Sequence, residues 1–278
     1  MSLSPILFGT AGIPISSRKQ DTLSGIERVK ELSLQAMELE FVHGVRMKQQ
    51  QAMEVKRAAE KNGIVLSVHA PYYINLNAVE REKREASRQR IIDSAIIGHT
   101  AGAKAVCFHA AYFQGMPRTR VFEGVKKELE KIIEETEKQE IACKIKPETT
   151  GKPTQFGSLT ELLEIYNETD LQPYIDFAHL HARENGRFKE REDVKKAFEE
   201  IEKTEKKLLK ELNIHMSGIN YGEKGEKNHL TLEEKANDFN YKWVLECLKE
   251  FDCKGTVICE SPNIELDAML MKKVFESI

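Results

Sequence analysis

Eight short apolar segments alternate with charged, amphipathic segments along this chain. Strands that alternate with helices in this way are typical of repeated βα units, and eight such units close a (β/α)8 barrel. The pattern predicts strands at Ile6–Gly9, Met37–Phe41, Ile64–Val68, Ala105–Phe108, Ala142–Pro147, Pro173–Ile175, Leu212–His215 and Gly255–Cys259. It predicts helices at Gly25–Gln35, Lys48–Lys61, Val79–Ala101, Arg118–Gln139, Ser158–Tyr166, Glu192–Lys210, Leu232–Glu250 and Ile264–Glu276. Ser158 and Thr231 are expected N-caps, and Gly63 and Gly102 are expected C-terminal caps.

The length of 278 residues suits one such barrel, which typically takes about 250. A hydrophobic fraction of 40% and a charged fraction of 31% fit a globular protein with a sizeable core and a charged surface. We therefore predict an α/β fold that forms a single TIM-barrel domain over residues 1–278.

Several classes of protein are disfavoured. The chain lacks an apolar run of about 18 residues, and its start lacks the basic and apolar stretches of a signal peptide, so we expect a cytoplasmic protein without a membrane partner. The five cysteines form no CxxC pair, which argues against a disulfide framework and a zinc ribbon. A net charge of −3 gives no global attraction for nucleic acid, although a local basic rim could still bind phosphate. No phosphate-binding P-loop or dinucleotide motif is present.

Six of the predicted strands stop at a histidine or a carboxylate. The segments are VLSVH, AVCFH, IKPE, YID, NIH and VICE, and the residues are His69, His109, Glu148, Asp176, His215 and Glu260. One such residue is ordinary in a loop, but catalytic groups of barrels come from the carboxyl ends of several strands. Six equivalent positions therefore predict a metal site at the carboxyl ends of the strands.

The types of ligand indicate the metal and its chemistry. Imidazole and carboxylate suit zinc, and also manganese or iron. Glu148 could bridge two ions, with His69 and His109 on one side and Asp176, His215 and Glu260 on the other. Two ions about 3.5–4 Å apart would activate a bridging water and clamp both oxygens of a displacement at phosphorus.

His179 and His229 could build a further metal position beside this pair. His181 competes with His179 for that role, and we favour His179 because Asp-x-x-His recurs among metal barrels. For His43 and His99, packing or capping is a sufficient role.

The ordered segments SVHAPYYINLN, CFHAAY, KPETTG, YIDFAHLHA, IHMSG, EKNHL and ICES resemble the endonuclease IV family of apurinic/apyrimidinic endonucleases, within the xylose-isomerase-like barrels. The resemblance spans nearly the whole chain. It implies a zinc-dependent phosphodiesterase in which a metal-bound hydroxide cleaves 5′ to an abasic site in double-stranded DNA and leaves a 3′-hydroxyl. It also implies a trinuclear zinc site. For this chain we expect two or three zinc ions and a monomer. The implied ligands are His69, His109, Glu148, Asp176, His179, His215, His229 and Glu260. Among them, Glu148 as the bridging carboxylate and Glu260 after the last strand are the expected catalytic residues.

The chain departs from the family at one position. The family usually has an aspartate two residues before the histidine that matches His229, and this chain has Lys227 there. A protonated lysine cannot be a metal ligand. We predict that Glu226 substitutes through a one-residue shift of the loop, and the competing outcome is a weaker or absent third metal site.

Two residues match DNA-contacting positions of the family. Tyr72 resembles the residue that wedges into the duplex, and Arg46 matches a basic residue that enters the base stack. An aromatic wedge fills the space of an unstacked base, and an abasic nucleotide is the easiest to extrude because its pairing is already lost. Packing of Tyr72 on the rim and solvation of Arg46 are the alternatives.

Two other functions remain open. A sugar isomerase or epimerase of the same barrel superfamily would use Glu148, Asp176, His215 and Glu260 around one divalent ion, and it has no need of the remaining histidines. A DNA-lesion binder without enzymatic activity is suggested only by Lys227 and ranks last.

Overall fold

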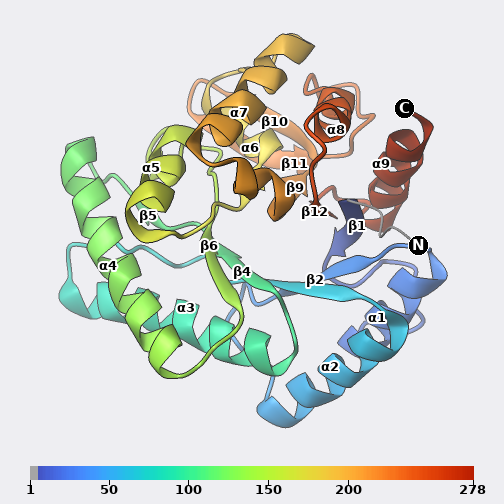
Figure 1. Cartoon of the computed structure of the whole chain (residues 1–278), viewed down its shortest axis with the longest axis horizontal. Coiled ribbons are helices and arrows are strands. Elements are labelled where there is room, and N and C mark those ends of the chain that lie inside the picture. Colours follow the sequence, from blue (N-terminus) through green and yellow to red (C-terminus); the bar gives the residue numbers. More distant parts are fainter. Residues whose placement is uncertain (1–5) are drawn as a thin grey trace. The chain divides into compact units, whose positions relative to one another are not determined.

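The computed structural model describes residues 6–278 and has an α/β fold with eight parallel strands, which confirms the predicted fold class (Figure 1). The chain divides into two compact units. Unit 1 comprises the residues up to Met37, Gly151–Pro153 and Tyr174–Ile278, and unit 2 comprises Glu38–Thr150 and Thr154–Pro173. The single domain over residues 1–278 stays a prediction. Residues 1–5, which begin the segment used in the signal-peptide prediction, lie outside the described part.

Unit 1 contains parallel strands in the order β1 (Ile6–Ala11), β12 (Gly255–Cys259), β9 (Leu212–Met216) and β8 (Ile175–Asp176). Its helices are α1 (Thr22–Glu31), α6 (Phe177–Arg183), α7 (Arg191–Thr204), α8 (Tyr241–Glu250) and α9 (Glu265–Ser277), with the 3-10 helix η1 (Lys206–Lys210). A hairpin of β10 (Gly218–Gly222) and β11 (Gly225–Leu230) follows β9. Gly9 is required in β1, because a Cβ there would lie 2.2 Å from the carbonyl oxygen of Ala36.

Unit 2 contains strands in the order β2 (Ala36–Glu40), β3 (Val65–His69), β4 (Ala105–Phe108) and β6 (Lys144–Pro147). The first two residues of β2 belong to unit 1. Its helices are α2 (Gln49–Asn62), α3 (Arg81–Thr100), α4 (Arg118–Lys138) and α5 (Leu159–Thr169). The short strands β5 (Ala111–Tyr112) and β7 (Gln155–Phe156) pair antiparallel. Figure 1 shows α3 and α4 next to one another, as their packing also indicates.

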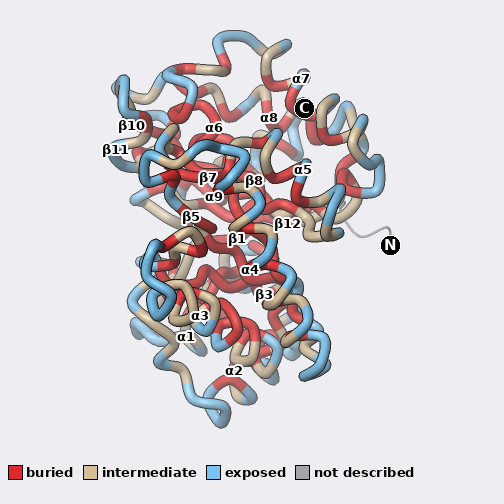
Figure 2. Tube along the Cα trace, turned by 90° about the vertical axis from the view of Figure 1, so that its left-hand side faces the viewer, coloured by how far each residue is buried: buried red, intermediate tan, exposed pale blue. Residues whose placement is uncertain are grey.

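Burial explains why these segments form these elements. All four residues of β4 are buried, as expected for a strand of a parallel sheet that is covered on both faces. Helix α7 buries Val194, Ala197, Phe198 and Ile201, which recur at the spacing of one helix face. Figure 2 shows the same pattern of burial: the strands are mostly buried, and the outer turns of the helices are exposed.

The predicted helix caps are confirmed at three of four positions. Ser158 forms a capping box with Glu161 at the start of α5, and Gly63 ends α2 with a positive φ of 67°. Gly102 follows α3 with a φ of 77°. A left-handed residue at this place satisfies carbonyl groups of the last turn, and glycine adopts it without steric cost.

The prediction of Thr231 as an N-cap, with a helix from Leu232, is wrong. Helix α8 begins at Tyr241, and Asn240 is its N-cap. Residues 231–240, which precede α8, are held by hydrogen bonds to distant segments instead. The Leu232 N–H donates to the Asp267 carboxylate at 2.7 Å, and the Ile219 N–H donates to Asn237 Oδ1 at 3.1 Å. These long-range bonds replace the first turns of the predicted helix.

No helix in the part of the chain that the structure describes is long and apolar enough to cross a membrane.

Candidate metal centre

Unit 2 brings three of the predicted ligands together. His69 ends β3, while His109 and Glu148 directly follow β4 and β6. The Nε2 atoms of both histidines face the same oxygen, Glu148 Oε2, at 3.4 Å for His69 and 3.3 Å for His109. The Glu148 side chain is fully buried. The parallel strands thus place two imidazoles and one carboxylate around one point.

These spacings fit a metal ion. Two atoms that bind a tetrahedral zinc ion at about 2.0–2.1 Å lie about 3.4 Å apart. His69 is also oriented for metal binding, because its Nδ1 lies 2.8 Å from the Ala70 carbonyl oxygen. An N–H at Nδ1 donates to that carbonyl and leaves Nε2 as the ligand atom. Cys107 Sγ completes a group with His69 and Glu148 whose ligand atoms lie within 4.8 Å of one another, and the sequence pattern does not identify this thiol.

The protonation of His69 depends on Glu148. Burial lowers the pKa of His69, but the hydrogen bond and the charge of Glu148 outweigh burial and raise the pKa to about 10. Without a metal ion, His69 is therefore an imidazolium ion at neutral pH. A metal ion at this position would replace the proton.

Unit 1 holds a second set of ligands. Asp176, His179, His229 and Glu260 offer ligand atoms that lie within 4.8 Å of one another. Asp176 ends β8 and caps α6, because its Oδ1 accepts the His179 N–H at 2.6 Å. This cap fixes the first turn of α6 and directs His179 back toward the end of β8. His215 lies beside the set, with its Nδ1 3.7 Å from Glu260 Oε1.

The hairpin supplies His229 in an orientation that suits a ligand. Its Nδ1 lies 3.2 Å from the Glu260 carbonyl oxygen, so a proton on Nδ1 leaves Nε2 as the ligand atom. That Nε2 is 3.3 Å from His179 Nε2, again close to the spacing of two ligands on one ion. Burial and the neighbouring His179 lower the pKa of His229, against the opposing charges of Asp176 and Glu226. Neutral imidazole, the form that binds metals, is therefore favoured.

Glu226 also reaches this set. Its Oε2 lies 3.5 Å from His179 Nε2. The pairing of β10 with β11 explains the position, since Asn220 pairs with Asn228 and Tyr221 with Glu226, which leaves Lys227 as the extra residue of a β-bulge. A bulge breaks the alternation of side chains, so Glu226 lies near the histidine set although it precedes His229 by three residues. The exposed Lys227 extends along the hairpin toward Gly222 instead.

Gly151 allows this close approach. Its carbonyl oxygen accepts the Glu226 N–H at 2.9 Å. A Cβ at position 151 would lie 2.5 Å from Glu226 Oε2 and 3.0 Å from His179 Cδ2. Any other residue would displace both side chains, and no local signal in the sequence singles out this glycine.

His181, the competitor of His179, has different surroundings. Its Nδ1 accepts the Phe188 N–H at 3.1 Å, so its Nε2 carries the proton and donates to Asp238 at 3.1 Å. Burial lowers the pKa of His181 despite the opposing effect of Asp238. Its ring also contacts the aromatic rings of Phe188, Tyr221 and Phe239. These contacts give His181 a structural role. His99 likewise accepts the Ala142 N–H.

The two residues proposed for DNA contact lie on neighbouring loops of unit 2. Tyr72 is 59% exposed, and its N–H donates to the Val42 carbonyl at 3.3 Å, which joins its loop to the loop of Arg46. Arg46 is exposed. The ring of His43 meets Tyr72 edge-on with centroids 5.6 Å apart, a contact that the sequence does not predict.

A further exposed aromatic residue follows Tyr72. Tyr73 is 52% exposed, and the guanidinium group of Arg90 lies 4.6 Å from its ring centroid. Tyr72 and Tyr73 are thus two adjacent exposed aromatic residues on the loop after β3.

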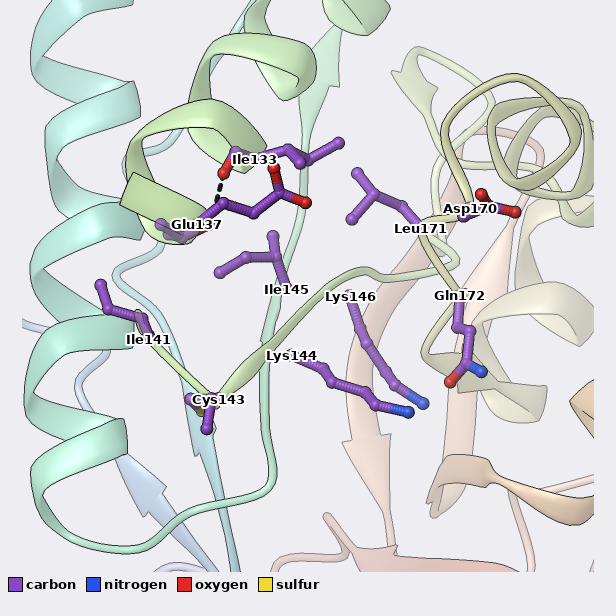
Figure 3. A pocket seen from close by; sticks show the side chains of 12 residues that line it. Ile133, Glu137, Ile141, Cys143, Lys144, Ile145, Lys146, Asp170, Leu171 and Gln172 are labelled. Carbon is purple, nitrogen blue, oxygen red and sulfur yellow. Dashed lines mark hydrogen bonds between the residues drawn. The ribbon is translucent and has the colours of Figure 1, made fainter. Parts of the chain in front are cut away.

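A pocket of about 250 Å³ in unit 2 lies away from these ligands (Figure 3). It is lined by the end of α4, the first residues of β6 and residues 170–172. Figure 3 shows Lys144 and Lys146 extending from β6 in the same direction. Because Glu148 follows the other end of β6, this pocket is separate from the His69, His109 and Glu148 set.

Comparison with known proteins places the chain in a family. Residues 26–276 match the xylose isomerase-like TIM barrel family, and the chain belongs to it. A relative in Methanocaldococcus jannaschii, the uncharacterized protein MJ0133, is 42% identical over 274 residues, which cover 98% of each chain.

Similar solved structures share the fold. Endonuclease IV from Thermus thermophilus has a TM-score of 0.74 at 18% identity and covers 98% of this chain and 100% of its own. A D-tagatose 3-epimerase-like protein has a TM-score of 0.72 at 20% identity, with 98% and 96% covered. The 3-keto-D-glucoside 4-epimerase YcjR from E. coli has a TM-score of 0.69 at 15% identity, with 99% of each chain covered. The neighbours therefore include both a nuclease and epimerases.

Proposed function

We propose that this protein is a metal-dependent DNA-repair endonuclease that hydrolyses the phosphodiester 5′ to an abasic site and leaves a 3′-hydroxyl. The observation that carries the proposal is the number of histidines directed at carboxylates. His69 and His109 face Glu148 in unit 2, and His179 and His229 face each other beside Asp176 and Glu260 in unit 1. A sugar isomerase that uses one ion has no need of so many imidazoles.

The donor sets suit zinc, with manganese or iron as alternatives. His69, His109 and Glu148 would hold metal in unit 2, and Asp176, His179, His215, His229 and Glu260 would hold metal in unit 1, joined by Glu226. Bound metal ions would supply an activated water and charge stabilisation at phosphorus. The carbonyl groups of Ala70 and Glu260 lie against Nδ1 of His69 and of His229, so an Nδ1 proton would donate to each carbonyl and Nε2 would be the ligand atom.

The loops of unit 2 would select the lesion. Tyr72 is exposed and supported edge-on by His43, and its backbone is tied to the loop that carries Arg46. An exposed aromatic ring that is supported in this way can fill the gap left by an extruded nucleotide. Extrusion costs least where the base is already missing, which would favour abasic sites in double-stranded DNA.

The test is incision of a duplex that contains one abasic-site analogue, with a panel of ketoses assayed in parallel. We expect incision 5′ to the lesion, loss of incision after prolonged chelation, and recovery with zinc. Glu148→Gln should lower the rate more than about 100-fold, because even residues that only support a metal ligand contribute about 10- to 100-fold. Glu130→Gln, at an exposed position of α4, should behave as the wild type. Interconversion of ketoses without incision would overturn the proposal in favour of an epimerase.

A further inference from the structure

A basic pocket of about 400 Å³ lies in unit 2, apart from the metal ligands. It is formed by residues 76–79 of the loop after β3, by Arg84 at the start of α3, by Met116, and by one face of α4. The α4 face contributes Arg120, Gly124, Lys127, Glu128 and Lys131. Four cationic side chains thus surround the pocket together with a single carboxylate.

That carboxylate is already neutralised. Glu128 pairs with Arg88 from α3 at 2.5 Å and with Lys131 at 2.5 Å. Burial opposes the ionisation of Glu128, but the two cations outweigh burial and lower its pKa. Glu128 therefore leaves no negative charge to balance the remaining cations.

Three cations of the pocket are not balanced by a carboxylate. Within residues 6–278, neither Arg120 nor Lys127 has an ion-pair partner. Arg84 binds the carbonyl oxygens of Ala78 and Val79 through Nη1, at 2.7 and 2.8 Å, which fixes the loop without cancelling the charge. An excess of positive charge around a concave surface attracts an anion, even in a chain with a net charge of −3.

Gly124 leaves room in the same pocket. Glycine inside a helix is about 1 kcal/mol less favourable than alanine. Packing does not require it here, because the only atom near a Cβ at this position would be Asn77 Oδ1, at 3.9 Å. A larger side chain would instead project into the space between Asn77 and the cations of α4.

From this pocket we infer a binding site for a phosphate group. Guanidinium and ammonium groups are the usual protein ligands of phosphate. The inference rests on the proposed function for its first source of phosphate, the backbone of the DNA substrate, since the loop that forms one wall of the pocket also carries Tyr72. A small phosphorylated compound is the second source. The site would add affinity for DNA without reading sequence, because contacts to phosphate position the duplex and contacts to bases specify it.

The test uses the full-length protein and three variants. The double variant Arg120→Gln/Lys127→Gln removes two unbalanced charges, and Gly124→Met fills the pocket while all charges remain. Lys138→Gln is the matched control, since Lys138 is an exposed lysine at the far end of the same helix. The measurement is fluorescence anisotropy with an abasic-site duplex at salt concentrations from about 50 to about 200 mM.

We expect the double variant to bind DNA about tenfold more weakly than the wild type. The binding constant should also depend less steeply on salt, with the negative slope of log K against log salt smaller in magnitude by about 1 for each phosphate that the variant no longer binds. Gly124→Met should also weaken binding, whereas Lys138→Gln should bind and incise DNA as the wild type does. If the double variant and Gly124→Met bind with the affinity and slope of Lys138→Gln, the inference is overturned while the proposed function stands.

A second arm separates the two sources of phosphate. If the wild-type protein neither binds nor incises DNA, the proposed function fails, and calorimetry with inorganic pyrophosphate tests the pocket by itself. Binding of pyrophosphate that is abolished in the double variant would support a site for a small phosphorylated compound. Absence of pyrophosphate binding by the wild-type protein in this case would overturn the inference.

Discussion

At the scale of single residues, the orientation of two imidazoles is the most informative feature. His69 and His229 belong to different units, yet in each the Nδ1 atom faces a backbone carbonyl and the Nε2 atom faces other candidate ligands. Metal-binding histidines almost always donate their other ring N–H to a carbonyl, a carboxylate or water in this way. The backbone at the ends of β3 and β12 therefore prepares these side chains before any ion binds.

Glu226 carries the first prediction. Glu226→Gln should lower the metal content by one ion per chain after dialysis, or weaken that ion about 10- to 100-fold, because a neutral amide is a poorer ligand than a carboxylate. Metal analysis by mass spectrometry and the absorption spectrum of the cobalt-substituted protein measure the effect independently of activity.

The control is Glu223→Gln, at an exposed position in the turn of the same hairpin. It should keep the wild-type metal content. Equal metal content and equal cobalt spectra in both variants would show that Glu226 is not a ligand.

At the scale of elements, the β10–β11 hairpin decides how the chain accommodates Lys227. The bulge removes Lys227 from the regular pairing and brings Glu226 next to His179. In a regular strand, residues two apart share a face. The residue two before His229 would therefore share its face in a regular strand. Because of the bulge, Glu226 occupies that place although it lies three residues before His229.

Deletion of Lys227 tests this account of the bulge. Without the extra residue, Glu226 would stand two residues before His229 and share its face in a regular hairpin. We expect the deletion variant to retain the full metal content, and addition of Glu226→Gln to the deletion to remove one ion. Loss of the ion in the deletion variant alone would contradict this interpretation of the hairpin.

At the scale of the whole molecule, three histidines with shifted pKa values contribute to the pH dependence of the stability of the metal-free protein around neutral pH. The pKa of His69 is raised to about 10, so its pairing with Glu148 stabilises the fold fully below about pH 6.5, and this contribution is lost as the pH rises toward 10. The pKa values of His181 and His229 are lowered, so their contribution is present above about pH 6.5 and is lost as the pH falls below it.

Urea unfolding of the chelated protein across this pH range gives the third prediction. For these groups, the free energy of unfolding should be greatest near pH 6.5 and should decline on both sides. His69→Gln should remove the alkaline decline and keep the acidic one. Metal-loaded protein should also lose the alkaline decline, because the ion already holds His69 in its neutral form. Identical slopes for the wild type and His69→Gln between about pH 7 and about pH 9 would refute the assignment.

Much of the fold could be predicted from local patterns. The strands Ala105–Phe108 and Gly255–Cys259 begin and end where the sequence predicts, because a strand buried on both faces is an uninterrupted apolar run. The predicted helix Leu232–Glu250 is wrong over residues 232–240, where the periodicity is helical but bonds to Asp267 and Asn237 hold the backbone in another conformation, and it is right over Tyr241–Glu250. Such long-range bonds leave no local signal in the sequence.

The sequence by itself determined the types and order of the candidate ligands, because a histidine or carboxylate recurs at the carboxyl ends of six predicted strands, where the catalytic groups of barrels lie. The sequence also favours His179 over His181 and Glu226 over Lys227, but only the tertiary structure shows which atoms face one another: His229 Nε2 faces His179 Nε2, Glu226 Oε2 faces His179 Nε2, and Gly151 lies against both Glu226 and His179. Each of these depends on a cap, a bulge or a close backbone approach between segments far apart in the chain. The spacing within the sequence indicates which residues are candidates, but the distances between their atoms are properties of packing in three dimensions.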